Sequence, residues 1–220
     1  MRTTAVSNQW QVTELTFAAS TEPSAAAGLP EGPHLLWEDG GVSITVNIPA
    51  PHWAGVPLQG TLCHGDSDSN CAGPPSGAGI IAFADPEYYV YGDPCAWSST
   101  RPETPATTVD ELVVALANQS LREASAPEDI TVDGYAGKKI VLQMAREVPD
   151  FNSCDEGKFS LFGVPSEDPA RYSQGPGQIE EVWIVDVNGQ FVVNIGLYYP
   201  YTAPSVVDQL RAILGSATFE

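Results

Sequence analysis

IEEVWIVDVNGQFVVNIGL, residues 179 to 197, is the stretch of this sequence that decides the fold. Its centre, Asn188-Gly189, is the strongest short signal for a β-hairpin, because both central positions of a type I′ turn need a positive φ. The sequence therefore predicts two paired strands, Ile179–Val187 and Gln190–Leu197. Residues 182 to 185 (VWIV) are all apolar, which predicts that other elements cover both faces of the first strand.

Two helices are predicted, one before this hairpin and one after it. Thr108-Val109-Asp110-Glu111 has the pattern of a capping box, and apolar residues then recur at helical spacing at Val109, Leu112, Val113 and Leu116. The second helix is predicted from about Ala203 to Leu214, with Thr202 as its N-cap and Pro204 in the first turn. Each helix has one apolar stripe, which needs an apolar sheet face to pack against.

Apolar patterns elsewhere predict further strands at Gly41–Ile48, Gly79–Ala84, Glu87–Tyr91, Asp129–Val132, Lys138–Met144, Lys158–Phe162 and Ala217–Phe219. The predicted fold class is α+β: a mostly antiparallel sheet covered by helices on its faces, in a single domain with irregular, disulfide-stapled loops. Residues 35–220 are expected to form this domain. Residues 1–34 are expected to form an N-terminal extension and flexible tether, because residues 18–34 are small, polar or rich in Pro and Gly.

The chain carries 28 acidic and 9 basic residues, which gives a formal net charge of −19. Such a field repels nucleic acid and anionic membrane surfaces, so neither is expected as a partner. It favours solubility and could attract cations or basic partners. The simpler interpretation is a solvated acidic surface.

Four cysteines, Cys63, Cys71, Cys95 and Cys154, form an even set without a C-x-x-C motif. Three of them lie in loop-like stretches, which favours disulfides over buried thiols. Of the three possible pairings, we favour Cys63 with Cys71, which closes one compact polar loop, and Cys95 with Cys154, which ties together two segments that flank the middle of the domain. Such bonds indicate an oxidising compartment; four reduced thiols in a cytosolic protein are the alternative.

No segment approaches the roughly 18 to 20 apolar residues of a membrane span, and the amino terminus (MRTTAVSNQW) lacks the apolar core of a signal peptide. With the cysteines, this favours an extracytoplasmic domain, secreted or membrane-anchored, whose targeting segment is not in the sequence. An N-terminal anchor in the full-length protein would fit the predicted tether.

Candidate chemistry is sparse. Asp66-Ser67-Asp68-Ser69-Asn70 has the start of a calcium loop, but Cys71 and Gly77 stand where that loop needs Gly and Glu, so no metal site is predicted. The histidines, His34, His52 and His64, all lie in the first 64 residues, and Ser76 lacks a nucleophile elbow. Adjacent strand residues point to opposite faces, so Glu180 and Glu181 cannot act on one bond, and a strand-entry surface is expected for them. No catalytic residue and no cofactor are predicted.

Tyrosines gather at two predicted strand ends, residues 88 to 91 and residues 198 to 201. If the two groups meet in space beside acidic residues, they could form a shallow platform for a sugar, a peptide or a protein partner. The candidate binding surface comprises Tyr88, Tyr91, Tyr199 and Tyr201. Ordinary cross-strand packing of β-favouring residues is the alternative.

Several motifs resemble the Mog1/PsbP-like fold, and more narrowly uncharacterised, lipoprotein-like envelope proteins of Gram-positive actinobacteria. They are Ile48–Trp53 (IPAPHW), Tyr91–Cys95 (YGDPC), Thr131–Lys138 (TVDGYAGK) and Val182–Gly189 (VWIVDVNG). The resemblance implies a Mog1/PsbP-like sandwich and export, and it brings no functional residue with it.

The leading functional hypothesis is a non-catalytic extracytoplasmic domain that binds an unknown protein or envelope ligand at the bacterial cell envelope. A second hypothesis is a hydrolase that acts on envelope polymer through surface carboxylates such as Asp85, Glu87 or Asp93. Two carboxyl groups roughly 5 to 9.5 Å apart in a concave pocket would favour it. A third hypothesis is a calcium-stabilised module.

Overall fold

The structure is a computed structural model, and it describes residues 28–39, 41–49, 52–56, 60–65, 73–145, 148 and 150–220. At its centre lies the predicted hairpin of β12 (Ile179–Val187) and β13 (Gln190–Tyr198). The strands pair from Val187 opposite Gln190 to Ile179 opposite Tyr198. Asn188 and Gly189 have φ values of 56° and 89°, as a type I′ turn requires. The hairpin prediction is confirmed.

This hairpin is the middle of a sheet with strand order β3-β4-β5-β13-β12-β9-β7, in which β8 also pairs with β9. Two three-stranded sheets, β1-β2-β14 and β11-β10-β6, accompany it, and every described strand pair is antiparallel. The remaining strands are β1 (Gly32–Asp39), β2 (Val42–Ile48), β3 (Trp53–Val56), β4 (Thr61–His64), β5 (Gly79–Asp85), β6 (Tyr89–Val90), β7 (Arg122–Ala124), β8 (Glu128–Val132), β9 (Tyr135–Met144), β10 (Ser160–Val164), β11 (Glu167–Tyr172) and β14 (Thr218–Phe219). The helices are α1 (Val109–Ala117) and α2 (Pro204–Gly215), with short 3-10 turns at Trp97–Ser99 and Asp155–Gly157.

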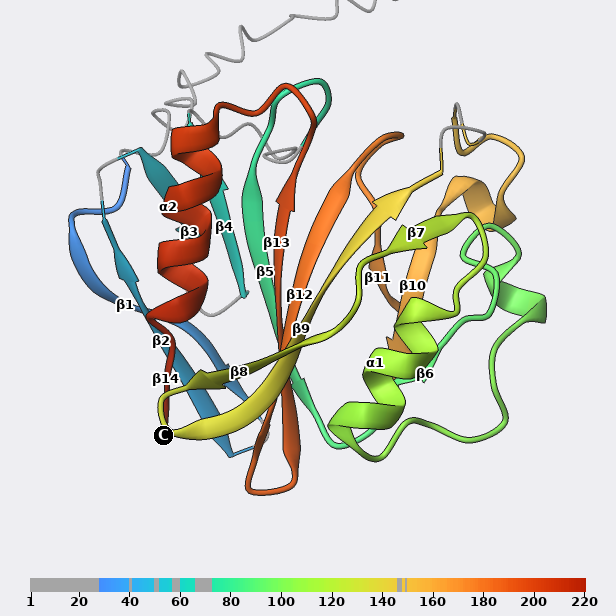
Figure 1. The fold of residues 1–220 in the computed structure, drawn as a ribbon, viewed down its shortest axis with the longest axis horizontal. Coiled ribbons are helices and arrows are strands. Elements are labelled where there is room, and N and C mark those ends of the chain that lie inside the picture. Colours follow the sequence, from blue (N-terminus) through green and yellow to red (C-terminus); the bar gives the residue numbers. More distant parts are fainter. Residues whose placement is uncertain are drawn as a thin grey trace, which may run out of the picture.

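Both faces of the hairpin are buried, as the VWIV run predicts. Ile184 belongs to an apolar cluster that includes Leu112 and Leu116 of α1. Its neighbour Val185 belongs to a second cluster, which includes Leu210 of α2. Consecutive strand residues point to opposite faces, so the two clusters lie on opposite faces of β12. Figure 1 shows α2 to the left of the central strands β5, β13, β12 and β9, and α1 to the right of them.

The two helix starts differ in how well they follow the sequence. The Thr108 side chain accepts a hydrogen bond from the Glu111 backbone N–H at 3.1 Å, so the predicted cap of α1 is confirmed. Thr202 is not the N-cap of α2, which is Ala203. The Thr202 hydroxyl instead accepts from the Tyr199 N–H at 3.0 Å and closes the turn before the helix, which removes it from the capping position.

Several strands were not predicted. β1 begins at Gly32, so the last residues of the predicted tether pair with β2, where Leu36 is buried in the core. β3, β4, β7 and β11 also lack an expected counterpart, and β6 covers only two residues of the predicted Glu87–Tyr91 strand. Short strands carry too few residues to show a period, and their pairing depends on distant parts of the chain. The rest of the predicted extension, residues 1–27, lies outside the described residues.

One predicted disulfide is confirmed. Cys95 is bonded to Cys154, at a sequence separation of 59, and ties the loop after β6 to the loop before β10. Cys63 in β4 is also disulfide-bonded, and its predicted partner Cys71 lies outside the described residues. No helix in the described part of the chain is long and apolar enough to cross a membrane.

The close approach of α2 to the sheet depends on Gly196 in β13. A Cβ atom at this position would lie 2.2 Å from Cδ2 of Leu210 in α2. We expect Gly196→Ala to lower the free energy of unfolding by about 1–3 kcal/mol, because the added methyl group overpacks this contact. Urea denaturation measures the change.

Gly215→Ala, at the end of the same helix, is the matched control. A Cβ there meets only Trp183, at 3.9 Å. Alanine is the better helix former, so this variant should be neutral or slightly stabilised. Equal destabilisation by both substitutions would contradict the role given to Gly196.

Candidate functional site

A cavity of about 290 Å³ lies beside the second half of β5. The pairing of β4 with β5 ends at Ile81, so another part of the fold borders the rest of β5 on this side. The cavity is lined by Trp37 and Asp39 of β1, by residues of β5 up to Asp85, and by the β10–β11 hairpin between residues 164 and 174. We call this space the β5 cavity. Its volume is at the lower end of the range for small-molecule sites.

Three carboxylates line the β5 cavity: Asp39, Asp85 and Glu167. Asp85 Oδ1 accepts a hydrogen bond from the Glu87 N–H at 3.1 Å, which orients this carboxylate. Burial raises the pKa of Asp85 above its usual value, and the negative charges of Glu87 and Asp39 raise it further, against the lowering effect of that hydrogen bond. Both effects make the charged carboxylate of Asp85 less favourable than that of an ordinary aspartate, and a nearby cation would offset them.

Two residues that line the same cavity each have a buried N–H group without a partner among the described residues. Arg171 is only 2% exposed, and its Nε–H is unpaired. The indole Nε1–H of Trp37 is also buried and unpaired among the described residues. A buried donor without an acceptor costs about 1–3 kcal/mol, so both N–H groups lower the stability of the fold.

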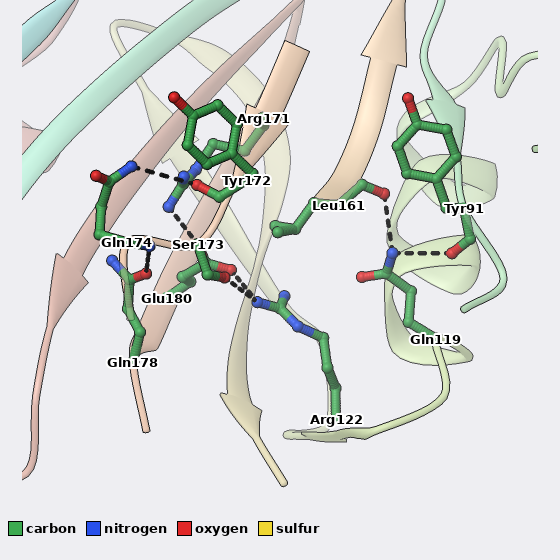
Figure 2. Close-up of polar contacts among 10 residues, drawn as sticks. All are labelled: Tyr91, Gln119, Arg122, Leu161, Arg171, Tyr172, Ser173, Gln174, Gln178 and Glu180. Atoms are coloured by element: carbon green, nitrogen blue, oxygen red, sulfur yellow. Dashed lines mark hydrogen bonds and ion pairs between the residues drawn. The ribbon is translucent and has the colours of Figure 1, made fainter. Parts of the chain in front are cut away.

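Arg171 also belongs to a buried ion triad, shown in Figure 2. The guanidinium groups of Arg122 in β7 and Arg171 in β11 each donate to one oxygen of the Glu180 carboxylate in β12. All three side chains are at most 2% exposed. Arg122 Nη2 also lies 3.3 Å from Ser173 Oγ. Burial alone would raise the pKa of Glu180, but the two guanidinium groups outweigh it and hold the pKa below its usual value.

The triad carries more positive than negative charge, because two guanidinium groups share one carboxylate. Tyr199 does not supply a second negative charge to balance the two guanidinium groups. Burial, and to a lesser extent the charge of Glu180, raises the pKa of Tyr199 to about 12, so the phenol is neutral at pH 7. Its hydroxyl has no hydrogen-bond partner among the described residues, and neither do Nε and Nη1 of Arg122. Arg171 is the member of this triad that lines the β5 cavity.

The predicted tyrosine surface is wrong for three of its four members. Tyr88 and Tyr91 are fully buried, and Tyr199 is 2% exposed. The Tyr88 hydroxyl donates to the Phe191 carbonyl in the core, and the Tyr91 hydroxyl donates to the Asp168 carboxylate. Only Tyr201 is exposed, at 80%. The rings serve cross-strand packing, the alternative noted for β-favouring residues.

The expected strand-entry surface at Glu180-Glu181 is also wrong, because both residues are buried. Their side chains point to opposite faces, as predicted, and on each face the carboxylate pairs with arginine. Glu181 accepts from Arg211 Nε of α2 at 2.8 Å and from the Tyr198 hydroxyl at 3.0 Å. Strands β9 and β13 pair with β12 on either side and bury residues 180 and 181. The two carboxylates therefore need cations beside them.

Of the acids assigned to a hydrolase, only Asp85 lines the β5 cavity. Glu87 accepts from the Tyr89 hydroxyl at 3.2 Å. Asp93 Oδ1 accepts from the backbone N–H groups of Cys95 and Ala96 at 2.8 and 3.1 Å, so it shapes the loop that holds the disulfide. The calcium-like stretch 66–70 lies outside the described residues, and within them no group of three or more His, Cys, Asp or Glu residues is placed to hold a metal ion.

Sequence reasoning missed Trp37, Asp39, Arg122, Glu167 and Arg171. The signal that could have identified the two arginines is the small number of basic residues, nine in the whole chain. An arginine in a strand of such an acidic chain needs a local acidic partner, and Arg122 and Arg171 both lie in strands.

No protein-family model matches the chain, and no curated protein matches it. Among solved structures, the chain is similar to the solution structure of cyanobacterial PsbP (CyanoP) from Synechocystis sp. PCC 6803. The two are 13% identical with a TM-score of 0.35, and the match covers 93% of this chain and 99% of that chain. PsbP belongs to the fold family that the sequence motifs resemble. At a TM-score this low, nothing about the site or the function follows from the similarity.

We expect Glu180→Gln to lower the free energy of unfolding at pH 7 by about 3–5 kcal/mol, because it leaves two buried guanidinium groups without a counter-charge. The depressed pKa means that the contribution of Glu180 is present above its unfolded value, roughly 4.3, and is lost as pH falls through the folded value. Urea denaturation at pH 7 and below pH 4 should therefore show a deficit that shrinks in acid. Glu128→Gln is the control, since its partner Lys139 lies at the surface, and it should change little. A deficit that does not depend on pH would contradict the electrostatic origin.

Proposed function

We propose that this chain is a non-catalytic, extracytoplasmic binding domain of the bacterial cell envelope that takes a small amine-bearing ligand in the β5 cavity. The observation that carries the proposal is the cavity itself, a concave space with the Asp85 carboxylate on β5 and the buried Arg171 in its wall. A cavity with apolar walls and a few convergent polar groups is the usual form of a small-molecule site.

The charge of the cavity supports a cationic group on the ligand. Asp39, Asp85 and Glu167 line the cavity, and Arg171 is the one basic residue among its described lining residues. An ammonium group beside Asp85 would compensate for the burial that is the main cause of its raised pKa, and for the negative charges of Glu87 and Asp39. The net charge of −19 also raises the local concentration of cations around the chain.

The location in the envelope is supported by the Cys95–Cys154 disulfide, because such bonds persist mainly in oxidising compartments. We further infer that the fold is the Mog1/PsbP-like sandwich that the motifs resemble, with a helix over each face of the sheet. The two apolar clusters, one containing α1 residues and one containing α2 residues, support this arrangement.

Asp85→Asn tests the proposal. We expect an amine-bearing compound to raise the melting temperature of the wild-type chain; at 100 times its Kd the stabilisation is about 2.7 kcal/mol, or roughly 5 to 10 °C for a domain of this size. The variant should bind roughly tenfold more weakly or worse, since a charge-assisted hydrogen bond is lost. Thermal shift and calorimetry with simple amines, diamines and amino acids provide the measurement.

The pH dependence has a definite sign. Asp85 has a raised pKa, so lowering the pH neutralises its carboxylate before an ordinary aspartate would be neutralised. Amine affinity should therefore fall between pH 7 and pH 4 in the wild-type chain, and less steeply in Asp85→Asn. Asp208→Asn removes an exposed carboxylate on α2 and should bind like the wild type. The proposal is wrong if no amine-bearing compound binds, or if the two variants bind alike.

One observation favours a hydrolase as the second candidate. A carboxyl group with a raised pKa shares a concave cavity with two other carboxylates, and a protonated and an ionised carboxyl group are the usual pair in glycosidases. Incubation with soluble envelope polysaccharide, followed by a reducing-end assay, separates the two functions. We expect no turnover. Turnover that Asp85→Asn abolishes would establish the hydrolase instead.

A further inference from the structure

Two of the chain's three histidines lie close together at one end of the β3–β4 strand pair. His52 directly precedes β3, and His64 is the last residue of β4. Their ring centroids are 6.3 Å apart, with an angle of 61° between the ring planes. His52 is exposed and His64 is half-buried, so both residues contact solvent and an ion can reach them.

The backbone holds these two residues at this spacing. The Gly65 N–H donates to the His52 carbonyl at 2.7 Å, and the His64 N–H donates to the Ala78 carbonyl at 3.0 Å. The two imidazoles are therefore neighbours because the strands that carry them pair. A pair of groups that is already in place loses little conformational entropy when it binds a common ligand.

Packing explains the position of only one of the two rings. The His64 ring lies edge-on against the indole of Trp53, with the centroids 5.3 Å apart. Trp53 is fully buried, and its Nε1 donates to Gln209 Oε1 of α2 at 3.1 Å, which fixes the indole. The His52 ring contacts only the His64 ring among the aromatic side chains of the described residues. Within those residues, neither imidazole takes part in a hydrogen bond or an ion pair.

Neighbouring imidazoles with free ring nitrogens suit one class of ligand. Imidazole nitrogen binds Zn²⁺, Cu²⁺ and Ni²⁺, whereas Ca²⁺ and Mg²⁺ prefer oxygen. An ion about 2.0–2.1 Å from one nitrogen of each ring places the two ring centroids roughly 5 to 6 Å apart. The observed separation of 6.3 Å exceeds this range only slightly, so a small side-chain rotation would let both rings bind one ion.

We propose that His52 and His64 form a surface chelate for a divalent transition-metal ion of the Zn²⁺, Cu²⁺ and Ni²⁺ class, with water completing the coordination. The described residues supply no third ligand. The ion is therefore held more weakly than in a structural zinc site, which uses four protein ligands. The net charge of −19 raises the local concentration of divalent cations. Neither histidine lines the β5 cavity, so this inference is independent of the proposed function.

Isothermal calorimetry of the full chain with NiCl₂ and ZnCl₂ tests the proposal, at high ionic strength so that the acidic surface is screened. We expect His52→Gln and His64→Gln each to bind either ion roughly tenfold more weakly or worse, because each variant leaves one imidazole ligand instead of two. Circular dichroism checks that each variant is folded.

His34→Gln is the matched control. It removes the third histidine, whose Nε2 lies 2.7 Å from the Pro30 carbonyl oxygen, and it should bind both ions like the wild type. CaCl₂ is the control ion, since carboxylates bind it and imidazole does not. If Ca²⁺ binds as tightly as Ni²⁺, or if the three variants bind Ni²⁺ alike, acidic side chains hold the ion and the proposal is wrong. Absence of Ni²⁺ and Zn²⁺ binding to the wild type would also overturn it.

A spectroscopic measurement identifies the ligands without any variant. Electron paramagnetic resonance of the wild-type chain with one equivalent of Cu²⁺ should show hyperfine coupling to two imidazole nitrogens. A spectrum with oxygen ligands alone, or with a single nitrogen, would contradict the chelate.

Discussion

The constraint on which the rest of this structure depends is the burial of the β12–β13 hairpin on both faces. Every residue of β12 from 180 to 185 except Trp183 is buried, and this includes two glutamates. A carboxylate cannot remain charged in such a place without cations beside it. The fold therefore brings Arg122 and Arg171 to one face of the strand and Arg211 to the other. The positions of β7, β11 and α2 are tied to these pairings.

The same constraint produces the candidate site. Arg171 reaches Glu180 from β11, which belongs to a different sheet from β12. The β10–β11 hairpin must therefore lie against the central sheet, and it does so next to the part of β5 that β4 leaves unpaired. The β5 cavity lies where this hairpin, β5 and β1 meet. A group with a structural role in the triad is thus also part of the wall of the β5 cavity.

The sequence predicted the elements whose signals are local. The Asn188-Gly189 turn, the Thr108 N-cap and the apolar stripe of α1 depend on neighbours within a few residues, and each matches the structure. The disulfide between Cys95 and Cys154 followed from counting cysteines and judging their surroundings. The prediction failed where distant segments decide the outcome. Nothing near Gly32 or Leu36 in the sequence shows that this segment pairs with β2.

The site was missed for the same reason. Tyrosines at strand ends suggested an exposed platform, yet Tyr88 and Tyr91 point into the core, because the segments that cover them are distant in sequence. The acids and donors of the β5 cavity come from β1, β5 and β11, none of which carries a motif. Their proximity is a property of the topology alone. A single sequence shows which charges must find partners, and the fold shows which partners they find.

Arg171 has two roles that cannot be varied independently. It holds the β10–β11 hairpin to the central sheet through Glu180, and it lines the β5 cavity. A ligand that accepted hydrogen bonds from this guanidinium would compete with Glu180 for it, so occupancy of the β5 cavity and the position of the hairpin would be thermodynamically linked.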